Sequence, residues 1–246
     1  AQGGEIVISE IHYEPSDSED YQFIELYNAG TGLVNLAGAR LAGGVDFLFP
    51  AATYLAPGAC VLVVENAVAF SNRYRTAGSP WYYPGLAVAG TWAGKLSDDG
   101  EAVSLLATNL ADLFSVTYEA GGEWPSRAAG KGSSLELAEP AAVPTNGPAR
   151  AALLAQGATW RSSSLNHGSP GRLDDYERPV VINEALSHTD LDTDWVELFN
   201  RNSTTSVLTG LYLGDSYANP LRYAFTNGTQ VAPGGYLVRQ AAQLGF

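Results

Sequence analysis

Residues 7–28 read VISEIHYEPSDSEDYQFIELYN, two apolar segments separated by a polar stretch. The same pattern returns at residues 181–200 as VINEALSHTDLDTDWVELFN. In each copy one glutamate lies in the first apolar segment and another lies in the second. A stretch of this length that occurs twice predicts two copies of one folding unit.

A third segment extends the repeat, because LAPGACVLV at residues 55–63 corresponds to VAPGGYLV at 231–238. The copies lie about 175 residues apart, a much longer period than the roughly 20 to 50 residues of a solenoid repeat. We therefore predict a complete first domain at residues 1–172, a short junction at 173–178, and a second domain at 179–246. We expect the second domain to be the N-terminal part only, because the later half of the first has no counterpart.

Short apolar runs bounded by Gly, Pro, Asn and Asp recur along the whole chain, and this pattern predicts an all-β sandwich or barrel with antiparallel strands. Helical periodicity is limited to short turns near 66–74 and 149–155. The apolar runs lie at residues 5–13, 21–28, 33–36, 45–49, 59–65, 101–107, 112–119, 179–186, 194–200, 207–213, 221–226 and 235–240.

The charge of the chain limits its partners. Thirteen basic and 26 acidic side chains give a net charge of −13, which repels phosphate and argues against nucleic acid and anionic membrane surfaces. No apolar run reaches the ~18 residues of a membrane-spanning helix, so membrane insertion is not expected. The single cysteine, Cys60, lies in an apolar run and reads as a small buried side chain. The partners that remain are protein, either other domains of the same chain or further copies in a self-assembly, and neutral glycans.

Several motifs occur in one order along the first copy, and together they resemble the lamin tail domain family in its bacterial, secreted or cell-surface form. The resemblance implies an immunoglobulin-like antiparallel β-sandwich that acts as an accessory interaction module and brings no catalytic residues. The motifs are ISEI at 8–11, FIELYN at 23–28, LAPG at 55–58, GKLSDDGEAV at 94–103, Trp124-Pro125, GKGSSLE at 130–136 and GSPG at 168–171.

The context of the chain is also predicted. The sequence starts at Ala1 in the manner of a mature protein whose signal peptide has been removed by a peptidase. Its preference for arginine over lysine, with abundant Ala and Gly, suggests a bacterial gene. We therefore expect a secreted or cell-surface bacterial location.

The first candidate site is acidic. Glu10 and Glu25 occupy matching places in two expected strands, as do Glu184 and Glu197 in the second copy. If each pair of strands forms a simple hairpin, the two glutamates of a pair face each other across the ladder. Like charges in that position are destabilising unless something compensates them.

In the second copy this acidic pair adjoins a loop that carries three more carboxylates. Asp190, Asp192 and Asp194 are spaced so that they could converge with Glu184 and Glu197 as oxygen ligands for calcium, the only cofactor that the sequence suggests. The first copy has a poorer ligand set, because an amide replaces one carboxylate. The alternative is a solvated acidic turn whose glutamates bond to neighbouring backbone.

The second candidate site is aromatic. Trp81, Tyr82 and Tyr83 are consecutive in an expected loop, where aromatic faces could stack on sugars or on a partner segment. The alternative is a loop folded over an open end of the sandwich.

Catalysis finds no support in the sequence, because His12, His167 and His188 are scattered and no nucleophile elbow or P-loop is present. We predict a noncatalytic, extracellular structural or adhesive module built of lamin-tail-like repeats. The alternative is a carbohydrate-binding or targeting module of a larger secreted bacterial enzyme.

Overall fold

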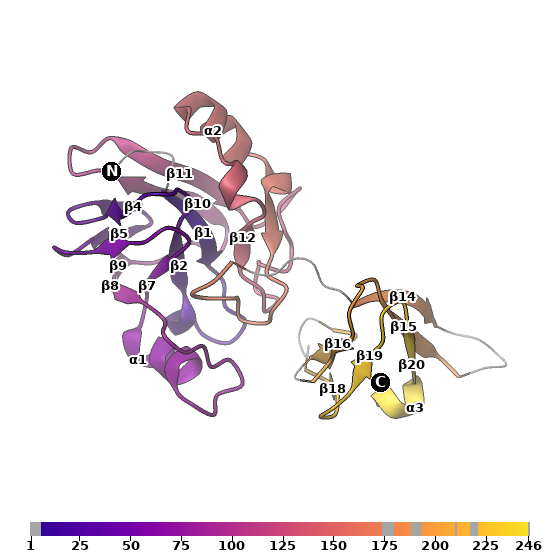
Figure 1. The fold of residues 1–246 in the computed structure, drawn as a ribbon. Coiled ribbons are helices and arrows are strands. Elements are labelled where there is room, and N and C mark those ends of the chain that lie inside the picture. Colours follow the sequence, from indigo (N-terminus) through magenta and orange to yellow (C-terminus); the bar gives the residue numbers. More distant parts are fainter. Residues whose placement is uncertain (1–5, 174–179, 188–192, 210, 217–220, 246) are drawn as a thin grey trace. The chain divides into compact units, whose positions relative to one another are not determined.

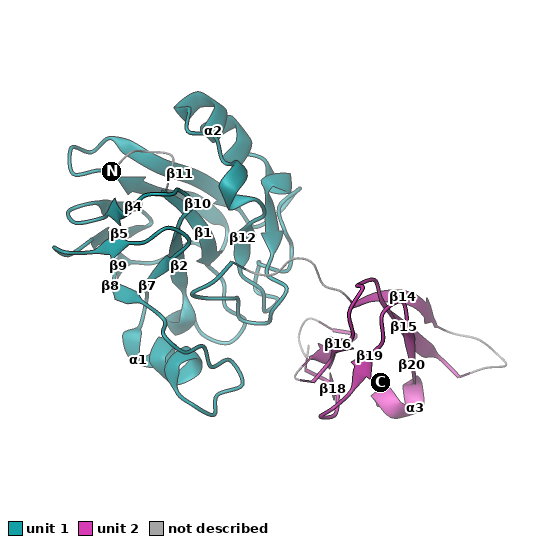
Figure 2. Cartoon of the chain, in the orientation of Figure 1, with its two compact units in different colours: residues 1–174 teal, residues 175–246 magenta. Residues whose placement is uncertain are grey.

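The computed structural model describes residues 6–173, 180–187, 193–209, 211–216 and 221–245. The chain divides into two compact units, residues 1–174 and 175–246 (Figure 2). Within the described ranges both units are built of β-strands, with three short α-helices.

Unit 1 contains a six-stranded and a five-stranded sheet (Figure 1). The first has the order β13-β12-β1-β2-β7-β8 and the second has the order β11-β10-β4-β5-β9. The strands of the first sheet are β1 (Ile6–His12), β2 (Phe23–Asn28), β7 (Cys60–Val64), β8 (Val88–Thr91), β12 (Leu135–Leu137) and β13 (Trp160–Ser162). Those of the second sheet are β4 (Arg40–Gly43), β5 (Val45–Leu48), β9 (Ala93–Gly94), β10 (Gly100–Leu106) and β11 (Asp112–Glu119).

The remaining elements of unit 1 are short. Strands β3 (Val34–Asn35) and β6 (Tyr54–Leu55) form a separate two-stranded sheet. Helix α1 (Ala67–Phe70) continues into a π-helical turn at Ser71–Arg75, and α2 (Gly147–Leu154) is the longer α-helix of this unit. Asn66 caps α1 and Asn146 caps α2, each by accepting from backbone N–H groups of the first turn.

The two sheets of unit 1 pack face to face and bury one apolar core. Ile8 and Ile24 of the first sheet share this core with Leu41, Val103 and Phe114 of the second, and all five are fully buried. Burial of such side chains is the main favourable term in folding, at roughly 1.5–3 kcal/mol each. The predicted antiparallel β-sandwich is confirmed.

The outer face of the six-stranded sheet is covered as well. Phe23, Leu62 and Val64 form a second cluster with Phe70 and Tyr74 from the α1 region. Because β1 and β2 are covered on both faces, all their residues except Tyr27 are buried, and these include polar side chains such as Glu10 and Glu25.

The expectation of antiparallel strands is wrong for one pair. Strand β8 runs parallel to β7, whereas the other pairs of named strands in the described ranges are antiparallel. The connection from β7 to β8 contains α1, and such a crossover brings the next strand back in the same direction.

Unit 2 is smaller. Its main sheet has the order β14-β15-β20 and is accompanied by two two-stranded sheets, β16-β19 and β17-β18. Leu198, Leu208, Phe225 and Val231 form its buried core. The elements are β14 (Val180–Leu186), β15 (Trp195–Asn200), β16 (Ser206–Val207), β17 (Tyr212–Leu213), β18 (Tyr223–Ala224), β19 (Gln230–Val231), β20 (Tyr236–Gln240) and α3 (Ala241–Leu244).

The register of β14, β15 and β20 repeats that of β1, β2 and β7. In both units the first two strands shift register at one position, next to the glutamate that faces its partner. Glu10 lies opposite Glu25, and Glu184 lies opposite Glu197. The predicted facing of the two glutamate pairs is confirmed.

One asparagine braces the turn after the second strand in each unit. The side-chain amide of Asn28 donates to the carbonyls of Gly32 and Leu55, both at 2.8 Å, and its Oδ1 accepts from the amide of Gly30 at 3.0 Å. Asn200 makes the corresponding bonds in unit 2, with donations to Thr204 and Val231.

We expect Asn28→Ala to lower the free energy of unfolding of unit 1 by about 2 kcal/mol, because it leaves a buried carbonyl without its donor. Denaturant melts followed by circular dichroism measure this loss. Asn35→Ala is the control, since Asn35 is exposed and accepts one bond from the amide of Ala37. Equal effects of the two variants would contradict the bracing role.

Candidate functional site

Three glutamates lie side by side across the six-stranded sheet of unit 1. Glu136 on β12 and Glu25 on β2 are the register partners of Glu10 on β1. All three are buried, with 3%, 0% and 1% of their surface exposed, respectively. We call Glu136, Glu10 and Glu25 the carboxylate row.

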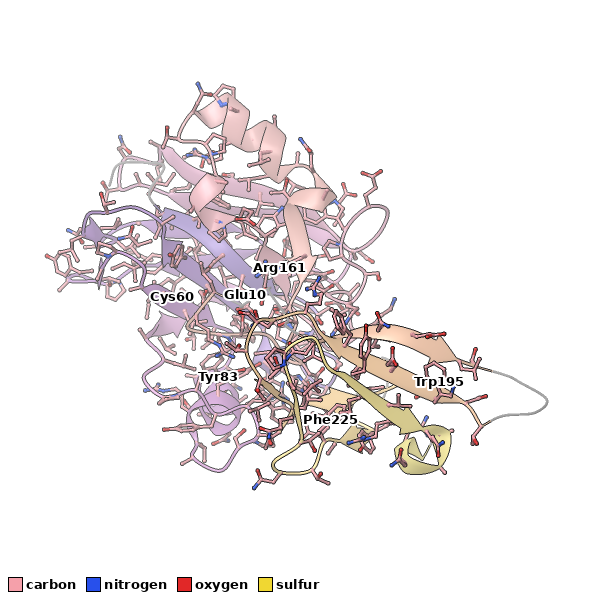
Figure 3. The ribbon with its side chains drawn as sticks, turned by 45° about the vertical axis from the view of Figure 1, so that its right-hand side comes forward. Glu10, Cys60, Tyr83, Arg161, Trp195 and Phe225 are labelled. Atoms are coloured by element: carbon pink, nitrogen blue, oxygen red, sulfur yellow. The ribbon has the colours of Figure 1, made fainter. Side chains whose placement is uncertain are left out.

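The register shift of β1 explains how the row arises. Ile8 and Ile11 both belong to the sandwich core, although they are three residues apart. Regular alternation would place them on opposite faces, and the irregularity between Ile8 and Glu10 restores the inward direction. Glu10 therefore points to the outer face of the sheet. Figure 3 shows Glu10 between Cys60 and Arg161 in the view.

A distant segment closes over the row. The amide of Ser169 donates to Glu10 Oε1 at 2.9 Å, and its hydroxyl donates to Glu136 Oε1 at 2.7 Å. The hydroxyl of Ser134 is a second donor to Glu10 Oε1. We call residues 168–171 the strap, since they link two strands that lie side by side.

The strap also reaches the third glutamate. The amide of Gly171 donates to Glu25 Oε2 at 2.5 Å, while the Ser9 hydroxyl donates to Glu25 Oε1 at 2.7 Å. Close approach requires glycine in the strap, because Gly168 has φ +85° and a Cβ there would lie 2.4 Å from Glu10 Oε1.

Burial favours the protonated forms of Glu10 and Glu25. The pKa of Glu10 is raised well above its ordinary value, first by burial and then by the charges of Glu136 and Glu25. Burial also raises the pKa of Glu25 to about 7, against the opposing effect of its hydrogen bonds from Ser9 and Gly171. Arg161 compensates Glu136 through a salt bridge of 3.1 Å. The row therefore acts as a hydrogen-bonded joint between sheet and strap.

Two other reactive side chains lie beside the row. Cys60 is half-buried, and burial followed by the charge of Glu25 raises the pKa of its thiol, so it stays protonated. His12 is fully buried, and its pKa is lowered well below the ordinary value by burial, His167 and Arg73. Neither ring nitrogen of His12 has a hydrogen-bond partner within the described residues. A thiol and an imidazole held neutral in this way are poorly suited to nucleophilic or acid–base work.

The three residues of the predicted aromatic site differ in their exposure to solvent. Trp81 is half-buried and meets His167 edge to face at 4.6 Å between ring centroids. Tyr83 is half-buried and stacks on Tyr74 at 6.4 Å, whereas Tyr82 is 42% exposed. Of the three, only Tyr82 is exposed. Binding of a glycan or partner by this loop stays a prediction.

The loop is anchored by a buried cation. Arg73 pairs with Asp17, contacts His167 Nδ1 at 3.1 Å and lies 3.2 Å above the ring of Tyr21. The same guanidinium is 5.6 Å from the ring of Trp81. Trp81 thus packs against two polar side chains, Arg73 and His167.

The predicted calcium ligands are only partly described. Asp190 and Asp192 lie outside the described residues. Glu184 is exposed, and Glu197 accepts a bond of 2.8 Å from the side chain of Asn183. The backbone carbonyl of Asp194 accepts from the amide of Ala241 at 2.8 Å, which ties the start of β15 to α3. Among the described residues no group of three or more His, Cys, Asp or Glu side chains is arranged to hold a metal ion, and the calcium site stays a prediction.

The sequence pattern predicted Glu10 and Glu25 as a pair, but it did not predict that Glu136 and the strap join them. Glu136 and Ser169 were noticed only as parts of the motifs at 130–136 and 168–171. A signal was present, because hydroxyl residues and a Gly-rich segment are the partners that buried carboxylates need. The pairing itself spans 159 residues between Glu10 and Ser169.

Comparison with known proteins agrees with this geometry. Residues 1–120 match the model of the family described as Lamin Tail Domain. Residues 1–120 belong to the lamin tail domain family. The match contains Glu10 and Glu25, and the family's immunoglobulin-like fold agrees with the sandwich of unit 1. It does not extend to the strap or to unit 2, so the complete domain at 1–172 and the second lamin-tail copy stay predictions.

Other similarities are weak. No curated protein matches the chain. A crystal structure of a DUF4876 family protein from Bacteroides thetaiotaomicron VPI-5482 is 16% identical, with a TM-score of 0.29. The similarity covers 42% of each chain. No helix among the described residues is long and apolar enough to span a membrane.

The row predicts an unusual pH dependence. Glu10 and Glu25 bind protons more tightly in the native state than in the unfolded state. Between the ordinary pKa of 4.5 and about 7, the native state therefore holds more protons, and stability falls as pH rises. We expect the melting temperature of unit 1 to drop from pH 5 to pH 8, and Glu10→Gln to reduce that drop.

Thermal melts across this pH range provide the measurement. Glu119→Gln is the matched control, since Glu119 is exposed at the end of β11 and its removal leaves the row intact. A melting temperature that rises with pH in the parent, and equally in Glu10→Gln, would rule out protonation of the row.

Proposed function

We propose that this chain is a noncatalytic, extracellular structural or adhesive module that acts through contacts between domains or between chains. Membership of residues 1–120 in the lamin tail domain family supports an interaction role. The carboxylate row supports it too, because these groups bond to the strap and hold the fold together instead of facing a substrate.

The observation that carries the proposal is the difference in burial between matching strands. Ile8 and Leu62 are fully buried in unit 1. Their register counterparts in unit 2, Ile182 and Val238, are 63% and 44% exposed. Tyr236, two residues before Val238, is 58% exposed. Ile8 belongs to the sandwich core and Leu62 to the outer cluster, so their counterparts Ile182 and Val238 lie on opposite faces of the small sheet. Val238 and Tyr236, two residues apart on β20, share one face, and their exposed apolar side chains mark a contact surface there.

The charge of the chain determines the kind of contact. At a net charge of −13, two copies repel each other at long range, so association must rest on short-range apolar packing and hydrogen bonds. A protein partner that adds little negative charge is favoured, and a nucleic acid or an inserted membrane segment is not among the proposed partners.

Sedimentation velocity of the full chain over a range of concentrations tests the proposal. We expect reversible association that increases with concentration and is weakened at least tenfold by Val238→Lys. Leu110→Lys is the matched control, because Leu110 is 68% exposed but lies in unit 1. A chelator arm tests the calcium proposal, since association lost with EDTA would assign the contact to the loop of Asp190, Asp192 and Asp194.

The contrary result is equally clear. A chain that stays monomeric at every concentration, and binds glycans in a manner abolished by Tyr82→Ala, would contradict the proposal. It would support the alternative, a carbohydrate-binding or targeting module of a larger secreted enzyme, which rests on the exposed ring of Tyr82.

A further inference from the structure

We propose that the free edge of β14 in unit 2 binds an extended segment whose sequence resembles residues 133–137, Ser-Ser-Leu-Glu-Leu, which comprise β12 and the two serines before it. The segment pairs antiparallel with β14 and lies outside residues 1–246. This inference rests on the proposed interaction role and names the partner of that role.

Unit 1 shows what this kind of edge binds. Strand β1 lies between β2 and β12, and it pairs antiparallel with both. On the β12 side, Glu10 is opposite Glu136 and Ile11 is opposite Leu135. Every residue of β1 is buried in this arrangement.

Strand β14 reproduces β1 but is paired on one side only within the described residues. It pairs with β15 in the register that β1 uses with β2, including the shift before the glutamate. Its other edge is the edge of the sheet, and four consecutive residues, Ile182 to Ala185, are exposed. An edge strand presents unpaired backbone N–H and C=O groups that can template a further strand.

The side chains of β12 explain the sequence preference. Leu135 and Leu137 are 0% and 2% exposed and share the core with Ile8. A leucine at the matching position would cover part of Ile182, the counterpart of Ile8. Ser134 donates its hydroxyl to Glu10, so a serine in the bound segment has an acceptor in Glu184.

A second folded copy of this chain cannot provide the segment. Its own β12 is buried between β1 and β13, and releasing it would open the core of unit 1. The occupant is therefore an extended segment that is not already part of a folded sandwich.

The test uses isotope-labelled full-length chain and a synthetic peptide of residues 131–139, KGSSLELAE. NMR titration should show saturable shifts at the amides of residues 183–185, whose hydrogen exchange then slows. The amides of β20, at the opposite edge of the same sheet, and those of β1 should stay unchanged.

Two matched controls sharpen the test. A peptide carrying Leu135→Lys and Leu137→Lys should lose binding at least tenfold, because it cannot cover the apolar face. Ile182→Lys in the chain should weaken binding of the parent peptide to a similar degree. This variant should keep the fold of unit 2, since Ile182 is already 63% exposed.

Absence of saturable shifts at β14, or equal shifts with the lysine peptide, would overturn the inference. Failure here is distinguishable from failure of the proposed function. If the chain still associates through Val238 while the peptide does not bind, the interaction role stands and the strand-pairing partner is wrong.

Discussion

The hydrogen bonds between the strap and the carboxylate row are the constraint on which unit 1 depends. Burial of three adjacent carboxyl groups is costly unless each is protonated or bonded. Ser169 and Gly171 bond all three, and they come from the far end of the unit. The row therefore has its hydrogen-bond donors only when the last segment of unit 1 has returned to the first strand.

The sequence predicted those features that depend on local pattern. The apolar runs placed β1, β2 and β7 within a few residues, and the spacing of Glu10 and Glu25 placed them opposite each other. Strands β12 and β13 were missed, because three residues are too few to show a period of two. The parallel pairing of β8 and the convergence on Ser169 depend on long-range topology, which no local pattern contains.

Unit 2 has the same pattern of first strands as unit 1, but the segments that cover these strands in unit 1 have no counterpart among its described residues. Its first strands keep the register and the asparagine brace of unit 1. No counterparts of β12 and the strap cover β14 within the described residues, and the side chains of Ile182 and Glu184 are exposed. The same sequence motif is therefore buried under the strap in unit 1 and exposed in unit 2.

Hydrogen exchange at the amides of Ser169 and Gly171 tests the central claim most directly. Both amides donate to buried carboxyl oxygens, so we expect them to exchange as slowly as the amides of β1 and only through global unfolding of unit 1. Exchange of these two amides at the rate of the exposed turns, while β1 stays protected, would show that the strap opens independently and would contradict the account.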